Sequence, residues 1–318
     1  AADMRRQWGI PVDKEQVFLS LGAMDGIDKV MRALRAILEE RGVARPAILF
    51  PEPGFNVPEW QARSFGYHLH PVQTTAEGYF KILPDQLDAT LKAHPDIHAI
   101  YLTVTNNPTT FAYNPPELKA LFAVLRPYWE QGRDIYLLAD LAYIGTAHNQ
   151  DDDKARMTTL TAPDVLKHTI FISSFSKVYT LTGERLGYVS IGDADLAPSF
   201  LPAWTNSNAS LPGEWQLRYM AYYRLISERP WLADKLRAFY RLRRNRLVAQ
   251  LNRINREQHL FECVHVGDDA TVYNWSQLAE GEDAFSLFEK TGIAGVPGSG
   301  FGYTDDYIRF SIGVIPVS

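Results

Sequence analysis

The sequence predicts an α/β protein with a large, mostly parallel central sheet, helices on both faces and a small α+β domain at the C-terminal end. Three observations support this fold class. Short, near-continuous apolar runs recur along the first two thirds of the chain, as expected for parallel strands buried on both faces. Stretches with apolar residues at helical spacing separate most of these runs. Beyond residue 260 the runs are shorter and flank one helical segment, which indicates a separate small unit.

The elements of the large sheet follow in chain order. Strands are expected at residues 17–19, 46–50, 67–72, 97–104, 135–139, 168–172 and 186–191. Helices are expected from a glycine turn at residue 22 to about residue 41, at 84–93, at 115–131 and at 230–254. Two more are expected to begin at residue 57 and after residue 212. Pro71 places its strand at a sheet edge, because proline cannot donate to a neighbouring strand. The strand at 186–191 is expected to close the sheet.

The predicted domains are a remnant of an N-terminal segment at 1–16, a large domain at 17–229, and an interdomain helix with a small domain at 230–318. In the small domain we expect strands at 263–266, 270–275 and 293–296, a helix at 283–290 and a last strand carrying Arg309. The polar stretches 147–156 and 204–212 are interpreted as exposed loops.

The helix at 230–254 is basic, and one set of its leucines and a phenylalanine is spaced for a buried face. Its arginines are interpreted as a solvated outer face rather than a nucleic-acid surface; they are Arg237, Arg241, Arg243, Arg244 and Arg246.

Composition favours a globular protein that binds neither nucleic acid nor membranes. Of 318 residues 46% are hydrophobic, and 32 basic against 37 acidic residues give a net charge of −5. No apolar run approaches the ~20 residues of a membrane-spanning helix. Cys263 is the single cysteine, which excludes an internal disulfide and a cysteine-built zinc site, and histidines and carboxylates show no HExxH spacing, so no metal site is predicted. With no signal-like opening and no initiator methionine, we expect a cytoplasmic protein that lacks its natural start.

A serine, a lysine and an arginine follow the apolar run at 168–172. Lys177 lies in a loop at the end of a buried strand, where desolvation favours the neutral amine that attacks an aldehyde to form a Schiff base. Ser174 and Arg185 offer a hydroxyl and a guanidinium fork, which are groups that hold a phosphate.

A carboxylate ends another apolar run. Asp140 follows residues 135–139, where an unpaired charge would be costly. A cation bound beside it would be a natural partner, because an opposite charge stabilises the ionised carboxylate. An N-capping role for this aspartate stays open.

The spacing of Ser174, Lys177 and Arg185 resembles the lysine motif of pyridoxal-phosphate (PLP) enzymes of the aspartate-aminotransferase fold, fold type I, class I/II aminotransferase-like. The resemblance covers about residues 17–314 and six motifs in family order. It implies that the turn at Gly22, Ala23 and Met24 holds the cofactor phosphate, Phe55 stacks on the pyridine ring, Asn107 and Tyr143 meet the phenolic oxygen, Asp140 pairs with the ring nitrogen, and Arg309 clamps the substrate α-carboxylate near Asn107.

The sequence departs from this family pattern in three places. Thr110 stands where the family's asparagine-proline-threonine-glycine motif has glycine, and most of the N-terminal arm and the closing C-terminal helix are missing. The stretch 204–212 contains no arginine of the kind that binds acidic side chains in some relatives, which disfavours a dicarboxylic substrate.

The resemblance implies a homodimeric, PLP-dependent aminotransferase that moves an amino group between an L-amino acid and a 2-oxo acid through a Lys177 Schiff base. The same site would support a decarboxylase, a lyase or an oxidase. From other classes, a ligand-sensing module of a transcription regulator and a cofactor-free structural protein stay open. Each of the six motifs alone also fits a structural role, and their joint order favours the enzyme.

Overall fold

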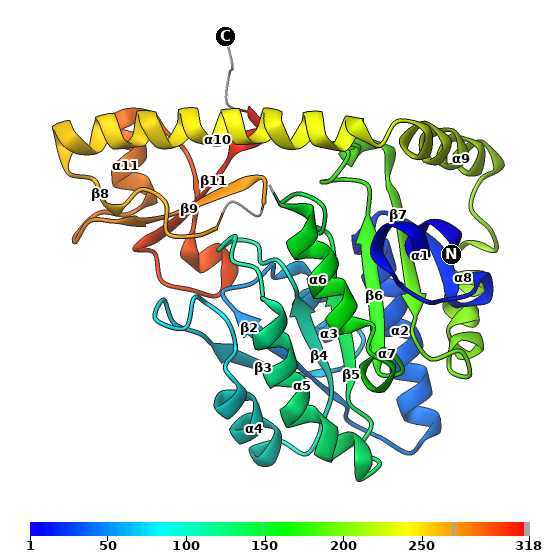
Figure 1. Ribbon diagram of the computed structural model, residues 1–318. Helices are drawn as coiled ribbons and strands as arrows, with labels where there is room; N and C mark the ends of the chain where they lie inside the picture. The colour runs from blue at the N-terminus through cyan, green and yellow to red at the C-terminus, as the bar shows by residue number, and fades with distance from the viewer. Residues whose placement is uncertain (148, 269–270, 315–318) are drawn as a thin grey trace.

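The computed structural model describes residues 1–147, 149–268 and 271–314, and in these ranges a seven-stranded sheet forms the centre of the molecule (Figure 1). Its strands are β1 (Val17–Leu21), β2 (Ala47–Glu52), β3 (His68–Gln73), β4 (Ile97–Thr103), β5 (Tyr136–Asp140), β6 (Thr169–Ser174) and β7 (Leu186–Ile191). Their order is β1-β7-β6-β5-β4-β2-β3, and only β7 runs antiparallel to its neighbours. The predicted fold class is confirmed.

Two details of the strand order test the sequence prediction. The strand that contains Pro71 lies at an edge, as predicted. The expectation that 186–191 closes the sheet is wrong, because β7 lies between β6 and β1 and the first strand of the chain forms the other edge.

Helices cover both faces of the sheet. They are α1 (Ala2–Trp8), α2 (Ala23–Glu40), α3 (Val57–Ser64), α4 (Pro84–Ala93), α5 (Pro115–Glu130), α6 (Gln150–Leu160), α7 (Pro163–Leu166), α8 (Leu201–Asn208) and α9 (Gly213–Glu228). Helices α4, α5 and α6 lie on one face of the sheet, and α2 and α8 lie on the other (Figure 1). Buried side chains of the first three share one hydrophobic core, and those of α2 and α8 share the other. Along β5 alternate residues enter opposite cores, Leu137 with α5 and Leu138 with α2, which explains why this strand is apolar throughout.

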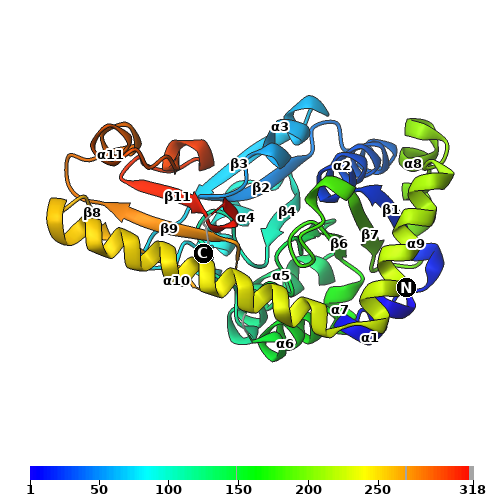
Figure 2. The same ribbon diagram turned by 90° about the horizontal axis from the view of Figure 1, so that it is seen from above.

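The small domain is a four-stranded antiparallel sheet in the order β10-β11-β9-β8. Its elements are β8 (Phe261–Cys263), β9 (Tyr273–Leu278), α11 (Ala284–Thr291), β10 (Val296–Pro297) and β11 (Tyr307–Ser311). Helix α10 (Trp231–Gln258), about 42 Å long, extends from the side of α9 and β7 to this sheet (Figures 1 and 2). Three predicted strands are displaced: β8 covers 261–263 instead of 263–266, β9 covers 273–278 instead of 270–275, and β10 covers 296–297 instead of 293–296. Residues 269–270 lie outside the described residues. The domain limits at 16/17 and 229/230 stay predictions.

Both predicted loops are partly helical. Residues 150–156 belong to α6, which Asn149 caps by accepting from the backbone N–H of Asp151. Asp153 is fully buried and accepts from Arg156 and from the N–H of Gly145, each at 2.8 Å. This buried ion pair anchors α6 together with Met157 and Leu160, which pack in the hydrophobic core. Most of the other predicted loop, 204–212, forms the end of α8. His148 lies outside the described residues.

The prediction of a solvated arginine face on α10 is wrong for two residues. Arg237 and Arg244 are buried and donate to the backbone carbonyls of Gly145 and Thr271, whereas Leu242 on the supposed buried face is 48% exposed. Loop carbonyls that pack against α10 need donors, and arginine supplies them where leucine cannot.

Candidate active site

A cavity of about 260 Å³ lies at the carboxyl edge of the large sheet, beside the small domain. Ten of the eleven predicted site residues line it: Ala23, Met24, Phe55, Asn107, Asp140, Tyr143, Ser174, Lys177, Arg185 and Arg309. The eleventh, Gly22, lies directly against Arg185. These residues come from the ends of β1, β2, β4, β5 and β6, from the start of β7 and from β11, so the fold brings together residues that are up to 287 positions apart, as open α/β sheets do at this edge.

One end of the cavity combines a helix N-terminus with a guanidinium. Gly22 precedes α2 with φ +85°, and the first N–H groups of a helix have no partner within the helix. Arg185 donates to the carbonyl of Leu21 at 3.0 Å and to that of Thr182 at 2.9 Å, which holds its fork beside the turn. A Cβ at position 22 would lie 2.2 Å from Arg185 Nη2, so the backbone angle favours glycine and any side chain here would displace the Arg185 guanidinium. This end is suited to bind a phosphate.

The floor of the cavity contains a buried carboxylate. Asp140 is 5% exposed, and it accepts from the Tyr101 hydroxyl at 2.5 Å and from the N–H of Ala142 at 2.8 Å. Burial raises the pKa of Asp140, and these two hydrogen bonds offset only part of that rise. A cation placed in the cavity beside Asp140 would stabilise its charged form.

Two tyrosines lie beside the predicted catalytic lysine. Lys177 follows β6 in a turn, and its Nζ donates to the Tyr273 hydroxyl at 3.4 Å. The Tyr143 hydroxyl donates to the same oxygen at 3.4 Å. Burial raises the pKa of Tyr143. Burial acts in the same direction on Tyr273, but the charges of Lys177 and Arg309 and its two hydrogen bonds outweigh it and lower the pKa of the Tyr273 phenol below its usual value.

The cavity wall also contains a second guanidinium. Arg309 on β11 donates from Nη1 to Asn107 Oδ1 at 2.8 Å, and its fork lies over the rings of Tyr273 and Phe301, 4.2 and 4.7 Å from their centres. Among the described residues, the buried Nε of Arg309 has no hydrogen-bond partner. A carboxylate would satisfy this donor, because arginine binds carboxylates through two parallel hydrogen bonds.

The departure at Thr110 keeps the backbone conformation of a glycine. Thr110 has φ +68°, in the left-handed region that β-branched residues rarely occupy. Its N–H donates to the carbonyl of Asn106 at 3.0 Å and its hydroxyl to that of Asp268 at 2.6 Å. These bonds hold the loop after Asn107 in place despite the substitution.

Comparison with known proteins places the chain in a family. The sequence model of the aminotransferase class I and II family matches residues 1–316, so the chain belongs to that family. It is 27% identical over 303 residues to an LL-diaminopimelate aminotransferase of Maridesulfovibrio salexigens, covering 91% of this chain and 73% of the relative. It is 26% identical over 302 residues to the putative aminotransferase YugH of Bacillus subtilis, covering 93% and 71%.

Solved structures show the same fold. An aspartate aminotransferase variant from Thermus thermophilus aligns with a TM-score of 0.78 at 20% identity, covering 98% of this chain and 79% of that one. YbdL from Escherichia coli, identified as having a methionine aminotransferase function, aligns with a TM-score of 0.79 at 18% identity, covering 98% and 78%.

The protein is therefore an aminotransferase that depends on PLP, and its cavity fits that cofactor. The fit rests on three observations: a turn where a Cβ at Gly22 would collide with Arg185, a buried carboxylate at Asp140, and a lysine, Lys177, in the same cavity wall. Among the described residues, no helix is long and apolar enough to cross a membrane.

Six further residues of the cavity wall are absent from the sequence prediction. They are Ile27, Thr103, Ala142, Ser176, Thr182 and Tyr273. Thr103 could have been predicted from the sequence, because it lies near the end of a predicted parallel strand, where it pairs with Asp140 of the neighbouring strand. Tyr273 was not, because 96 positions separate it from Lys177 and its strand belongs to the small domain.

Proposed function

We propose that Lys177 carries the cofactor covalently and moves the proton at the substrate Cα while an amino group passes between an L-amino acid and a 2-oxo acid. The observation that carries this assignment is the position of Lys177, the one lysine among the described residues that line the cavity, with Asp140 and Arg309 in the same wall. When bound, PLP supplies an electron sink for the charge that develops at Cα. The lysine amine then serves as general base and general acid.

The other residues hold the cofactor in this proposal. Arg185, Ser174 and the turn at Gly22, Ala23 and Met24 bind the phosphate. Asp140 keeps the ring nitrogen protonated, Phe55 packs on the ring, and Asn107 and Tyr143 meet its phenolic oxygen. Support comes from the cavity, which all of these residues except Gly22 line, and from the close approach of Gly22 to Arg185.

Arg309 binds the substrate α-carboxylate. The contact with Asn107 holds its fork, and its buried Nε, which has no hydrogen-bond partner among the described residues, can donate to a carboxylate. A carboxylate bound in this way would orient Cα toward the lysine. The names of the similar proteins give different amino acids as substrates, among them diaminopimelate and methionine, so the proposal leaves the amino donor open.

The test is a transamination assay with a panel of amino acids, each with and without a 2-oxo acid acceptor. Transfer requires the acceptor, whereas a decarboxylase, lyase or oxidase forms product without it. We expect acceptor-dependent product with the unmodified protein and with Lys92→Ala, an exposed lysine on α4, and none with Lys177→Ala. Full transamination by Lys177→Ala would refute the assignment.

We also propose that the protein works as a homodimer. Leu217 and Met220 lie about one turn apart on α9 and are 68% and 60% exposed, and none of the residues of α9 is fully buried. Apolar side chains this exposed favour contact with a second copy. Sedimentation equilibrium should give twice the chain mass, and Leu217→Asp with Met220→Asp should shift it toward the single-chain mass. The cytoplasmic location stays a prediction, tested by cell fractionation.

A further inference from the structure

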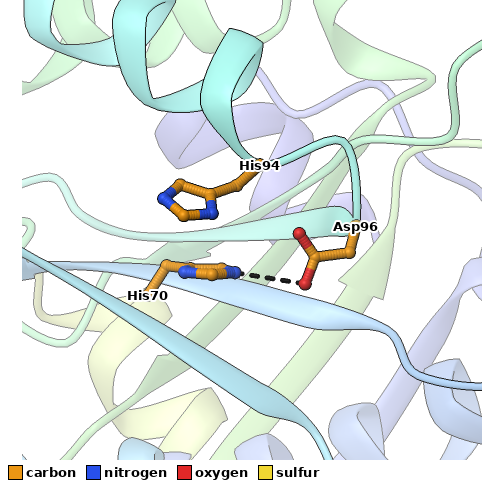
Figure 3. A group of neighbouring side chains, drawn as sticks. All are labelled: His70, His94 and Asp96. Atoms are coloured by element: carbon orange, nitrogen blue, oxygen red, sulfur yellow. Dashed lines mark hydrogen bonds and ion pairs between the residues drawn. The ribbon is translucent and has the colours of Figure 1, made fainter.

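Two histidines and an aspartate meet at the opposite edge of the large sheet from the cavity. His70 lies on β3, and His94 and Asp96 lie in the turn between α4 and β4 (Figure 3). β4 begins just after this turn, and its last residue, Thr103, lines the cavity. A strand of seven residues spans about 20 Å, so the cluster is separate from the cofactor site.

The three side chains face one another closely. His70 Nε2 lies 3.2 Å from Asp96 Oδ2, and the rings of His70 and His94 are 4.0 Å apart between centres (Figure 3). One ligand atom from each residue lies within 4.8 Å of the others. His68, two positions before His70 on the same face of β3, has Nδ1 3.8 Å from Asp96 Oδ2.

The backbone under the cluster is fixed from several sides. Asp96 accepts from the N–H of Ala47 at 2.9 Å, which ties the turn to β2. Arg133 donates to the carbonyls of His94 and Leu91 at 2.8 and 2.9 Å, which ties it to the end of α4. His98 Nδ1 contacts the Asp96 carbonyl at 2.6 Å. Only side-chain torsions therefore have to change if the three groups approach one common atom.

We propose that His70, His94 and Asp96 bind a divalent transition-metal ion of the zinc class, with His68 or water in the fourth position. Imidazole nitrogen and carboxylate oxygen form zinc sites with bonds of about 2.0–2.2 Å, which places tetrahedral ligand atoms about 3.4 Å apart. From a spacing of at most 4.8 Å, the ligand atoms have to approach by no more than about 1.4 Å. No HExxH spacing reveals the site, because β3 and the turn that form it are 24 positions apart.

The ligand chemistry selects the metal. Two imidazoles and a single carboxylate suit Zn²⁺, Co²⁺ or Ni²⁺, whereas Mg²⁺ requires an octahedral shell of oxygen ligands. The His70 ring and the Asp96 carboxylate are already partly shielded, since the His70 side chain is 18% exposed and that of Asp96 36% exposed. A bound ion would link β3 to the α4–β4 turn and leave the cavity unchanged.

The test uses the PLP-bound protein after treatment with a chelator. Calorimetric titration with Zn²⁺ should give one site per chain, and Co²⁺ should give the visible absorption of a tetrahedral complex. We expect His94→Ala, His70→Ala and Asp96→Asn each to weaken Zn²⁺ binding by at least tenfold, because even residues that only orient ligands contribute about 10- to 100-fold. His259→Asn, a histidine at the end of α10, is the matched control and should bind as the unmodified protein.

A second measurement needs no variant. Zn²⁺ should protect His70 and His94 from diethyl pyrocarbonate, while His259 stays reactive. Transamination should be the same before and after chelation. Absence of a saturable site, binding that survives all three substitutions, or equal competition by Mg²⁺ would overturn the proposal.

Discussion

Replacing Asp140 by asparagine removes the charge at the floor of the cavity and preserves its shape. The carboxylate is 5% exposed and accepts one hydrogen bond on each oxygen, from Tyr101 and from the N–H of Ala142. An asparagine keeps the bond from Ala142 on its oxygen, and the Tyr101 hydroxyl rotates to accept from the new amide. The variant should therefore fold.

Two magnitudes follow from this geometry. Converting two charge-assisted hydrogen bonds to neutral ones removes about 1 kcal/mol each. The loss of the ionic partner of a buried cation costs about 3–5 kcal/mol, because the remaining charge is then unpaired. At 1.36 kcal/mol per tenfold, PLP affinity and kcat/KM together should fall by roughly 10²- to 10⁴-fold.

The cofactor-free protein should respond to pH in a defined direction. Because burial raises the pKa of Asp140 in the folded state, the protonated side chain stabilises the fold below the unfolded pKa, and this contribution is lost as pH rises through the folded pKa. The uncharged asparagine has no such dependence. The stability of Asp140→Asn relative to the unmodified protein should therefore increase as pH rises above about 4.

The assays are a PLP titration, steady-state kinetics and urea unfolding of the cofactor-free protein at several pH values. Asp153→Asn is the matched control: its carboxylate is also buried and its pKa is also raised by burial, but it pairs with Arg156 away from the cavity. It should destabilise the fold and leave PLP affinity unchanged. Unchanged PLP affinity in Asp140→Asn, or a stability difference that does not grow with pH, would refute the reasoning.

Three further substitutions test individual contacts. Gly22→Ala should weaken PLP binding because its Cβ would displace Arg185, whereas Gly42→Ala, with φ +82° and open space, should lose stability only; equal PLP affinities in a titration would contradict this. Tyr273→Phe should lower kcat by roughly 10- to 100-fold through loss of the Lys177 contact. In the unmodified protein, ionisation of Tyr273 should produce an alkaline limb below pH 10 in the pH profile of kcat, and Tyr273→Phe should lack this limb. An unchanged profile would count against a role for the Tyr273 hydroxyl. Arg309→Lys should raise KM for the amino acid roughly 10- to 100-fold without changing PLP affinity, since lysine cannot form two parallel bonds; an unchanged KM would exclude the clamp.

The strand ends were predictable because burial and topology act together. A polar residue that stops an apolar run, such as Asp140 after β5, necessarily lies at the carboxyl edge of a parallel sheet. Ser174 ends β6 and Lys177 follows in the next turn for the same reason. The convergence of these residues of the large domain can therefore be predicted without knowledge of long-range contacts.

Contacts between distant segments were not predictable in this way. Hydrophobic periodicity does not reveal that Asp153 and Arg156 form a buried ion pair, so α6 resembles an exposed loop in the sequence. The partners of Arg237 are loop carbonyls, which no sequence pattern indicates. Tyr273 approaches Lys177 only because the small domain folds over the edge of the large sheet.

The central claim is that Lys177 carries PLP in this cavity. The most direct measurement is the absorption spectrum of the protein with PLP before and after borohydride, followed by peptide mapping. We expect a visible or near-ultraviolet band that changes with pH, and one borohydride-stable modification on the peptide containing Lys177, absent from Lys177→Ala. A folded protein that takes up no PLP, or a modification on any other lysine, would contradict the account.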